Sequence, residues 1–307
     1  MPVPEHSSAA LDEAAETFAS LRPRLFGIAY RMLGSAAEAE DIVQEAWLRW
    51  QAYDRDSVRD PAAFLATTTT RLAINDLRSA RSRRETYLGP WLPEPVDTAA
   101  DPALGAETGE ALEMAILVLM EKLSPTERAA YVLREAFHYP YGQIADIVQA
   151  SEDNARQLVS RARKRVAEQR REAVRPAEQR RLLTAFLAAA REGDLVRLEE
   201  LFAADVVSYS DSGGAVRAAR IPVAGRTTVA KFIAAFASTY WTGAEFSWVE
   251  ANGGASVLAS RDGTAFVMFT ISASGDGIEQ IMWVMNPAKL AGIAAAAPPR
   301  MGTGDTA

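Results

Sequence analysis

The sequence contains no cysteine and only two histidines, His6 and His138, among its 307 residues. Without thiols the chain can form no disulfide bond, thiolate metal site, iron–sulfur cluster or cysteine nucleophile. Both histidines lie in the first half, so the second half can hold neither a histidine-ligated metal nor a histidine base. We also expect no metal site and no cofactor.

A surplus of positive charge is also missing, because 33 lysines and arginines are outnumbered by 40 aspartates and glutamates, for a net charge of −7. This balance excludes a strongly basic nucleic-acid coat protein, although one domain can still carry a basic face. No stretch approaches the roughly 18 apolar residues that a membrane-spanning helix needs. The N-terminus lacks a basic region followed by an apolar run, so we expect a cytoplasmic protein that does not contact a membrane.

Prolines at short spacing separate two blocks with helical patterns. Residues 11–84 and 109–175 carry apolar residues at helical spacing. The segment between them, 85–108, contains four prolines, a density that prevents a regular helix and stiffens the chain. A flexible tether needs no tryptophan, so Trp91 and its apolar neighbours predict that this linker docks on another part of the protein.

The pattern changes after Pro176, where strand-like runs follow predicted helices. Helices are expected at 178–192, 194–202 and 227–239. Strands are expected at 206–210, 246–250, 256–260, 264–272 and 277–285. Asparagine–glycine and aspartate–glycine pairs between the later strands are typical of hairpin turns. We predict an α+β domain over 178–293 with an antiparallel, curved sheet, followed by a flexible tail over 294–307.

The second helical block carries a helix–turn–helix pattern. A short helix is expected over 141–148 and another over 152–166, with Ser151 as the cap of the second. Apolar residues form the inner stripe of the second helix, and six polar residues point outward: Arg156, Gln157, Ser160, Arg161, Arg163 and Lys164. Arginine and glutamine suit base edges in the major groove of DNA, and the other cations suit phosphates. The alternative is an ordinary helical hairpin with a solvated basic face.

Two further polar faces lie in the first block. A helix that begins near Pro61 ends in a polar, basic group: Asn75, Asp76, Arg78 and Arg81. Such a group can hold a single DNA strand by its backbone and by hydrogen bonds to splayed bases, or it can simply complement the carboxyl end of a helix. The acidic helix over 38–50 offers a surface for another protein, with a solvated amphipathic helix as the alternative.

Three motifs occur in an order that resembles the sigma factors of bacterial RNA polymerase, of the extracytoplasmic-function type. Residues 40–47 resemble sigma region 2, and residues 64–78 resemble the adjoining promoter-melting part. Residues 123–163 are similar to sigma region 4. Order, spacing and linker match over residues 14–172.

The resemblance implies roles for the polar faces. A region 2 domain over 11–84 would bind core RNA polymerase and the minus-10 promoter element, and a region 4 domain over 109–175 would bind the minus-35 element. The polymerase-binding residues would be Asp41, Gln44, Glu45 and Trp47. The minus-10 residues would be Asn75, Asp76, Arg78 and Arg81, and the minus-35 residues would be Arg156, Gln157, Ser160, Arg161, Arg163 and Lys164. The second helix begins with Asn154-Ala155-Arg156, which departs from the usual family pattern, so the resemblance does not give the promoter sequence.

Three more motifs look like the marks of one group of these sigma factors, which carries a C-terminal SnoaL-like domain, a cone of curved sheet and helices. They are Trp91–Pro95, Asp211–Gly214 with Val216–Arg220, and Asn286–Leu290. We hypothesise that the third domain contacts the linker and the sigma domains and modulates their activity in cis. The contact residues would be Trp91, Leu92, Pro93, Glu94, Pro95, Asp211, Gly213, Gly214 and Arg217. The alternative is that Ser212-Gly213-Gly214 is only a hairpin turn.

The predicted fold is therefore multidomain, with two all-α sigma domains and a C-terminal α+β SnoaL-like domain. The predicted function is promoter-specific transcription initiation with core RNA polymerase and promoter DNA as partners, without covalent chemistry. One alternative is a one-component transcription regulator with a ligand-binding domain. Another is a small-molecule enzyme fused to a DNA-binding domain, with acid–base candidates Asp211, Arg217, Arg220, Glu245, Glu250 and Glu279. Whether the third domain binds a small molecule stays an open question, because no residue of the sequence indicates a particular ligand.

Overall fold

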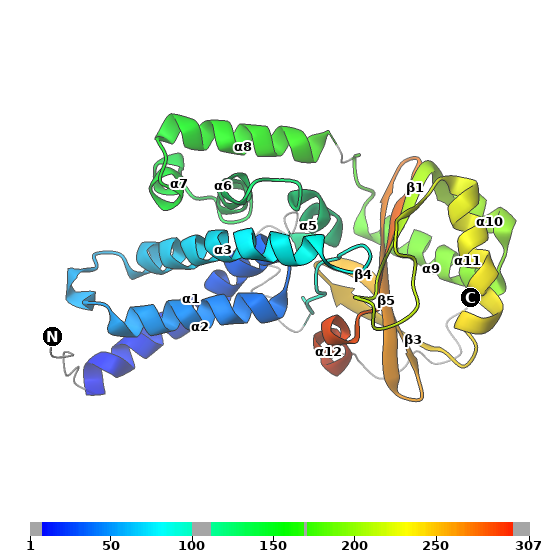
Figure 1. Ribbon diagram of the computed structural model, residues 1–307, viewed down its shortest axis with the longest axis horizontal. Helices are drawn as coiled ribbons and strands as arrows, with labels where there is room; N and C mark the ends of the chain where they lie inside the picture. The colour runs from blue at the N-terminus through cyan, green and yellow to red at the C-terminus, as the bar shows by residue number, and fades with distance from the viewer. Residues whose placement is uncertain (1–7, 100–111, 169–170, 297–307) are drawn as a thin grey trace. The chain divides into compact units, whose positions relative to one another are not determined.

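The structure is a computed structural model that describes residues 8–99, 112–168 and 171–296 (Figure 1). The chain divides into two compact units. The first comprises residues 1–83, 106–111 and 120–165, and the second comprises 84–105, 112–119 and 166–307. No helix among the described residues is long and apolar enough to cross a membrane.

The first unit is helical. Before the linker it contains α1 (Ser8–Leu33), α2 (Ala36–Ala52), the 3-10 helix η1 (Arg55–Ser57) and most of α3 (Pro61–Glu85). After the linker it contains α6 (Pro125–Glu135), α7 (Tyr141–Val148) and most of α8 (Glu152–Ala167).

Side-chain caps explain where several of these helices begin. The carboxylate of Asp60 and the hydroxyl of Ser151 each accept a hydrogen bond from the backbone N–H three residues further on, at 3.0 and 3.2 Å. Ser124 and Glu127 form a reciprocal capping box at the start of α6. These caps satisfy N–H groups that the first turn of a helix leaves unpaired, and they confirm the predicted helix starts.

Two buried arginines hold α1 against α6 within the first unit. Arg31 and Arg128 are 1% and 0% exposed. Nε of Arg128 donates to the carbonyl oxygen of Arg31 at 2.9 Å. The guanidinium of Arg31 also lies 5.1 Å from the ring centroid of Phe137, a cation–π arrangement. These contacts join helices that precede the linker to helices that follow it.

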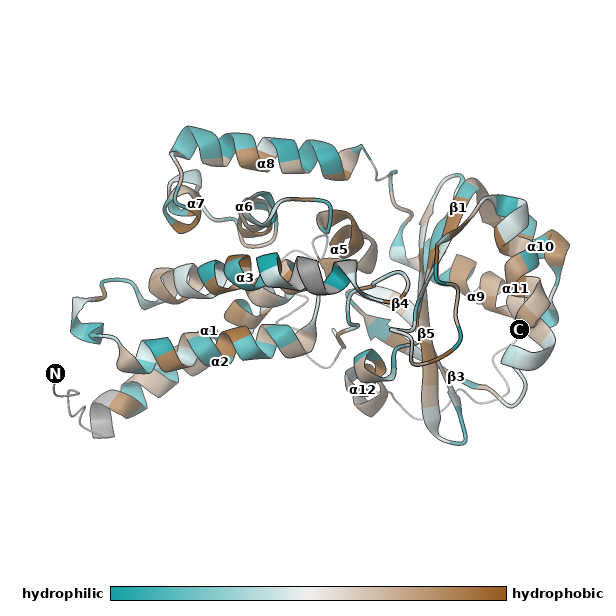
Figure 2. Cartoon of the chain, viewed as in Figure 1, coloured by the Kyte–Doolittle hydropathy of each residue, from teal (hydrophilic) through white to brown (hydrophobic). Residues whose placement is uncertain are grey.

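Helices α7 and α8 form the predicted helix–turn–helix. The residues that they bury against the unit are Ile144, Ala145, Ile147, Ala155, Leu158, Val159 and Ala162. Gln149, with a φ of 57°, ends α7 in the left-handed conformation. Figure 2 shows α8 as largely hydrophilic with a few apolar positions. The predicted amphipathic second helix is thereby confirmed.

The second unit is an α+β domain with one six-stranded sheet (Figure 1). The strands are β1 (Phe202–Asp211), β2 (Val223–Ala224), β3 (Glu245–Ala251), β4 (Gly254–Arg261), β5 (Thr264–Ser274) and β6 (Gly277–Val284), in the order β2-β1-β6-β5-β4-β3. The helices are α5 (Met114–Met120), α9 (Pro176–Glu192), α10 (Leu195–Leu201), α11 (Arg226–Tyr240) and α12 (Pro287–Ala296).

The sheet is mixed, which corrects the prediction of an antiparallel one. Strands β3 to β6 pair antiparallel in sequence order, whereas β1 runs parallel to β6. A parallel pair needs a long connection, and here α11 and three hairpin strands lie between the two partners. The predicted hairpin turns are present, because Asn252 and Gly253 have φ values of 56° and 72°, and Asp262 and Gly263 have 51° and 77°.

Both faces of the sheet are apolar and covered. Phe269 and Trp283 point to one face and share a core with residues of α9 and α11. The neighbouring residues Met268 and Met282 point to the other face and share a second core. Members of this second core from outside the sheet are Leu92, Met114, Leu290 and Ile293. The linker, α5 and α12 therefore cover the second face.

Helix α12 follows the last strand, where no helix was predicted. It extends to Ala296, so residues 294–296 of the predicted tail are helical. Residues 297–307 of the tail and 100–108 of the linker lie outside the described residues.

Candidate nucleic-acid interface and linker-binding site

The six minus-35 candidates all lie exposed on α8. Several are tied to carboxylates: Arg156 pairs with Glu152, and Arg163 pairs with Glu135 at 2.7 Å. Exposed ion pairs of this kind contribute about 0–1 kcal/mol, so the arginines can exchange a carboxylate for a DNA phosphate at little cost. Gln157 lies on the exposed surface of the amino-terminal half of α8, the part of a recognition helix that contacts base edges.

Glu127 links the start of α6 to α8. Its carboxylate pairs with Arg165 at 2.7 Å and with Arg161 at 3.5 Å. Burial raises the pKa of Glu127, but hydrogen bonds from Ser124 and the two arginine charges together lower it below its ordinary value. One carboxylate therefore serves both as part of a helix cap and as the anchor of α8.

The minus-10 candidates lie on α3. Asn75 and Arg78 are exposed and Asp76 is half-buried, while the side chain of Arg81 lies outside the described residues. Arg71, one turn before Asn75, donates to the carbonyl oxygens of Asp146 and Ile147 at the end of α7, at 2.7 and 3.0 Å. The structure thus joins α3 to the helix–turn–helix, a contact that the sequence did not indicate.

A cavity of about 600 Å³ lies between the end of α2 and the start of α3. Its lining combines aromatic, hydroxyl and guanidinium groups: Arg49, Ala52, Tyr53, Ala63, Phe64, Thr67, Thr68 and Arg71. The rings of Tyr53 and Phe64 are 4.6 Å apart, and Tyr53 is 45% exposed. The motif over residues 64–78 includes Phe64 and Thr67, but Tyr53 was not predicted, although an aromatic side chain outside the apolar stripe of a helix is a usable signal.

The predicted polymerase-binding residues lie on α2. Asp41 and Gln44 are exposed, and Glu45 pairs with Arg49 at 2.8 Å. Trp47 is half-buried, with its ring 5.0 Å from that of Phe18 of α1, so part of its role is to pack the two helices together.

Leu48 completes this face and was missed from the sequence. It is 52% exposed and follows Asp41 by seven residues and Gln44 by four, so the three share one side of α2. An exposed leucine among polar residues is the kind of anchor that protein interfaces use.

Asp211 is the centre of a site for the linker in the second unit. Its side chain is fully buried and accepts hydrogen bonds from the backbone N–H of Leu92 at 2.7 Å and from the hydroxyl of Tyr87 at 2.5 Å. Nζ of Lys289 lies 2.7 Å from the same carboxylate and also donates to the carbonyl oxygen of Leu92. Both polar groups of the Leu92 backbone are therefore held by one buried ion pair.

Aromatic rings of the linker surround the lysine. Nζ of Lys289 lies 4.3 Å from the ring centroid of Trp91 and 5.2 Å from that of Tyr87. Burial lowers the pKa of Lys289, and the charge of Asp211 acts against this shift. The remaining motif residues lie alongside: Pro93 and Pro95 are buried, and Glu94 is half-buried.

The two glycines after Asp211 lie close against the linker. Gly213 and Gly214 have φ values of 55° and 81°. A Cβ on Gly213 would lie 2.8 Å from the hydroxyl of Tyr87, and one on Gly214 would lie 2.8 Å from Leu88. The backbone of Ala215 also donates to Ser212 at 3.0 Å, so the segment is both a turn and a close contact.

Asn252 forms a second contact with the linker. Its side-chain oxygen accepts from the N–H of Val96 at 3.2 Å, and its own N–H donates to the Val96 carbonyl at 3.0 Å. Its amide nitrogen donates to the carbonyl of Leu112, before α5, at 3.2 Å. The sequence offered Asn252 only as a turn residue, because its partners lie 140 or more residues away.

The acid–base candidates do not come together. Asp211 is bound to Lys289 and the linker, Glu250 accepts from Thr98 at 3.1 Å, and Glu279 pairs with Arg171 at 3.3 Å. Arg217 makes no hydrogen bond or ion pair with any described residue; it is exposed and lines an apolar cavity, whose described lining includes no carboxylate.

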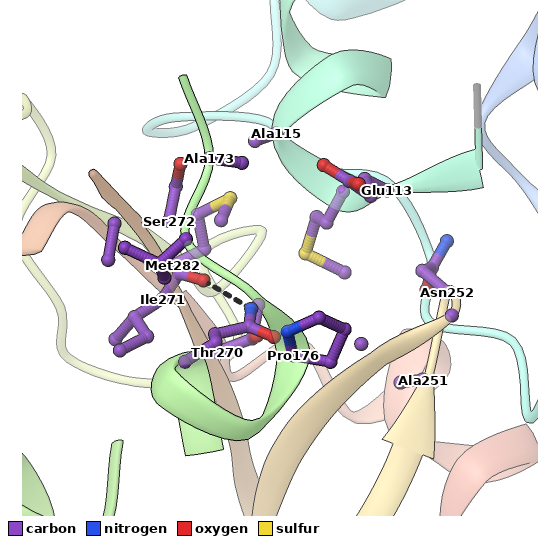
Figure 3. Close-up of a pocket in the computed structure, with 16 residues that line it drawn as sticks. Glu113, Ala115, Ala173, Pro176, Ala251, Asn252, Thr270, Ile271, Ser272 and Met282 are labelled. Carbon is purple, nitrogen blue, oxygen red and sulfur yellow. Dashed lines mark hydrogen bonds between the residues drawn. The ribbon is translucent and has the colours of Figure 1, made fainter. Parts of the chain in front are cut away.

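A small hollow of about 130 Å³ lies where α5 and residues 173–176 meet the sheet (Figure 3). Figure 3 shows Glu113 and Ala115 on one side of this hollow and Thr270 and Met282 of the sheet among the residues on the other. Nε2 of Gln179 donates to the carbonyl of Ile271 at 2.8 Å across its floor. It has room for a few water molecules and marks the seam between the sheet and its cover.

Comparison with known proteins places the helical parts in known families. Residues 17–83 match the family Sigma-70 region 2, and residues 113–166 match Sigma-70, region 4. The chain is 40% identical over 237 residues to the ECF RNA polymerase sigma factor SigJ of Mycobacterium tuberculosis, covering 74% of each protein. It is 33% identical over 205 residues to the probable ECF RNA polymerase sigma factor SigI of that organism, covering 66% of this chain and 71% of the relative.

The architecture agrees with these similarities. The crystal structure of the M. tuberculosis extracytoplasmic function sigma factor SigJ superimposes with a TM-score of 0.73 at 33% identity, covering 91% of this chain and 98% of that one. The predicted fold class, two helical sigma domains followed by a domain with a curved sheet, is confirmed. The chain belongs to the extracytoplasmic-function RNA polymerase sigma factors, which direct promoter-specific transcription initiation.

Proposed function

We propose that the C-terminal domain of this sigma factor modulates transcription initiation in cis, by holding the linker between regions 2 and 4. The observation that carries the proposal is the buried ion pair of Asp211 and Lys289, which binds both the N–H and the carbonyl of Leu92. The side chains of Asp211 and Lys289 are 0% and 11% exposed. When the linker leaves, this pair loses its hydrogen bonds and meets water, so its state depends on where the linker lies.

The second apolar face of the sheet supports the same proposal. Met268 and Met282 are 0% and 1% exposed because Leu92, Met114 and α12 cover them. Met114 belongs to α5, the first helix of the region 4 match. Figure 2 shows α5 as apolar throughout. Detaching the linker or α5 would expose apolar surface on both partners, at about 25 cal/mol for each Å².

The experiment is in vitro transcription with core RNA polymerase, on a promoter selected from a random library, comparing the full chain with its Asp211→Asn variant. The substitution keeps the shape of the side chain and removes the charge that binds Lys289 and Leu92. We expect the same promoter with a changed yield of transcript. Glu200→Gln, at an exposed position of α10, is the matched control. Equal yields from Asp211→Asn and the wild type would contradict the proposal.

For the promoter contacts, we propose that the exposed residues of α8 read the minus-35 element and that α3 binds the minus-10 strand. The cavity of about 600 Å³ beside Tyr53 and Phe64 fits a splayed base, because bases stack on aromatic rings and bond to hydroxyl and guanidinium groups. Permanganate footprinting of the open complex tests this, since Tyr53→Ala would reduce strand opening while leaving double-stranded minus-35 binding unchanged.

For the polymerase contact, we propose that Asp41, Gln44, Glu45 and Leu48 form one surface of α2. The exposed leucine would supply the apolar centre and the polar residues the rim. Leu48→Asp should weaken binding to core polymerase. Ala19→Asp, which introduces the same charge at an exposed position of α1, serves as the control in the same pull-down titration.

We also propose that the protein performs no covalent chemistry and acts in the cytoplasm, where RNA polymerase works. Support comes from the apolar cavity of the C-terminal domain, whose described lining offers Arg217 but no carboxylate or histidine to act as a base. Turnover of a small molecule by the purified full chain would contradict this.

A further inference from the structure

The C-terminal domain contains a cavity of about 460 Å³ that the linker site does not use. Its walls come from α11, from the ends of β1 and β6, and from the loop after Gly214. The lining residues are Ser210, Arg217, Ala218, Ala219, Phe232, Ile233, Phe236, Tyr240, Trp241, Trp283 and Met285. This volume lies within the range of about 300–1,000 Å³ that is usual for small-molecule sites.

The walls are apolar and mostly aromatic. Trp283 satisfies its only polar atom elsewhere, because Nε1 donates to the hydroxyl of Ser208 at 2.9 Å. The rings of Trp241 and Trp283 lie 6.1 Å apart, and Phe236 is 48% exposed, so the cavity opens to solvent. A wall of this composition favours an apolar ligand over water.

A few polar groups on the wall have no partner among the described residues. Arg217 is exposed and forms neither an ion pair nor a side-chain hydrogen bond there. The hydroxyl of Tyr240 is buried without a hydrogen-bond partner, and burial raises the pKa of this hydroxyl, which keeps it a donor. Asp211, which follows the lining residue Ser210, is committed to Lys289 and leaves Arg217 without a carboxylate.

We propose that this cavity binds a small amphiphilic acid, with an aliphatic or aromatic body among the rings and one carboxylate on the guanidinium of Arg217. Arginine and carboxylate form a charge-assisted, often bidentate pair, and the apolar body contributes by leaving water. A neutral or cationic ligand of the same size would leave the guanidinium unpaired, so an anion fits this cavity better.

The cavity shares residues with the surroundings of the linker, so ligand binding can affect how the linker is held. This point rests on the proposed function. The loop that contributes Arg217, Ala218 and Ala219 also lines a hollow of about 300 Å³ with Leu88 of the linker. Ser210 of the cavity directly precedes Asp211 of the linker site. Ligand binding can be measured without polymerase. A negative result would therefore contradict the ligand site without contradicting the proposed control of the linker.

The test is calorimetric titration of the full chain with decanoate and with 2-naphthoate, and with 1-decanol and 2-naphthalenemethanol as uncharged counterparts. We expect saturable binding of at least one acid at one site per chain, with the uncharged counterpart about tenfold weaker or more. Arg217→Gln should remove this difference by weakening the acid alone. Arg226→Gln, an exposed arginine of α11 that does not line the cavity, should bind like the wild type.

Three outcomes would overturn the proposal. They are no saturable binding of either acid, equal binding of acid and alcohol to the wild type, and equal effects of Arg217→Gln and Arg226→Gln. Both variants change exposed residues, so loss of folding does not confuse the comparison; circular dichroism verifies this.

Discussion

Asp211 and Lys289 form an ion pair that is expensive to bury, and the linker backbone supplies the hydrogen bonds that make it tolerable. The two residues are 78 positions apart, and Leu92 is 119 positions from Asp211. Asp211 precedes Gly213 and Gly214 by two and three positions, but nothing local to position 211 indicates which cation or which backbone it contacts. The partner follows only from the fold.

Lys289→Met should destabilise the second unit strongly. It would leave the carboxylate of Asp211 buried without a counter-charge, at a cost of about 3–5 kcal/mol. Urea unfolding of the full chain, followed by tryptophan fluorescence, measures the loss. The double variant Asp211→Asn with Lys289→Met should recover part of it, because both charges are then gone. A loss below about 0.5 kcal/mol in the single variant would mean that the pair is not desolvated.

Gly213→Ala separates the two readings of the glycine segment. Both Gly213 and Gly253 have positive φ, at 55° and 72°, but a Cβ on Gly253 would meet nothing within 4 Å. Each alanine costs about 1–2 kcal/mol for the left-handed backbone. Gly213→Ala should cost about 1–3 kcal/mol more, because its Cβ meets Asn286 and Tyr87. Equal losses by thermal unfolding would favour a turn without a tight linker contact.

At the scale of the element, α8 shows which features a sequence pattern predicts and which it does not. The apolar stripe and the caps predicted the two helices and their exposed basic face, because these signals act within a few residues. The pattern did not predict that Glu127 of α6 would anchor Arg161 and Arg165, or that Arg71 of α3 would bind the end of α7. Those pairings depend on how helices from separate parts of the chain pack.

The anchoring of α8 should depend on pH. Because the pKa of Glu127 is lower in the folded state than its unfolded value of about 4.3, its contribution to stability is present above that value and is lost as pH falls through the folded pKa. Glu127→Gln should therefore lose stability at neutral pH and show a smaller further loss under acid than the wild type. The measurement is the urea midpoint of both proteins at several values between pH 7 and pH 3. If the folded state does not stabilise the carboxylate, the midpoint changes with pH by the same amount in the variant and in the wild type.

The residues of α8 should divide into those that read bases and those that position the helix. Gln157→Ala should weaken holoenzyme binding to the minus-35 element by about 1–3 kcal/mol and relax the preference at one base position. Lys164→Ala should weaken binding to all sequences alike and reduce the salt slope by about one. Binding titrations at several salt concentrations, on a small library of minus-35 variants, distinguish the two. A sequence-independent loss in both variants would contradict the assignment of Gln157.

At the scale of the whole molecule, the sheet of the C-terminal domain packs against segments from outside that domain. Its first face is covered by α9 and α11 of the same domain, as in Figure 1, whereas its second face needs Leu92 and Met114 from outside it. Cutting the chain between region 4 and this domain would therefore expose two apolar surfaces, the second face of the sheet and the side chains of the linker and α5 that pack on it.

A chain that ends after Arg175 tests this dependence. We expect this shortened chain to bind more of a hydrophobic dye than the full chain does, because the linker and α5 lose the sheet that buries them. With core polymerase it should start transcription at the same promoter to a different extent, and the sign of the difference states whether the C-terminal domain restrains or supports initiation. Equal yields and equal dye binding would show that the sheet does not control the linker.

The helices, the hairpin strands, the helix–turn–helix and the membership of the sigma factors are all contained in local patterns. Caps, turn residues and apolar spacing act over a few positions, and family motifs keep their order along the chain. The parallel pairing of β1 with β6, the cavity beside Arg217, and the burial of Leu92 between Asp211 and Lys289 have no local signal. All three depend on how segments that are distant in the sequence pack together. Leu92 is buried because a sheet with two apolar faces must be covered on both, and only the folded chain determines which distant segments cover it.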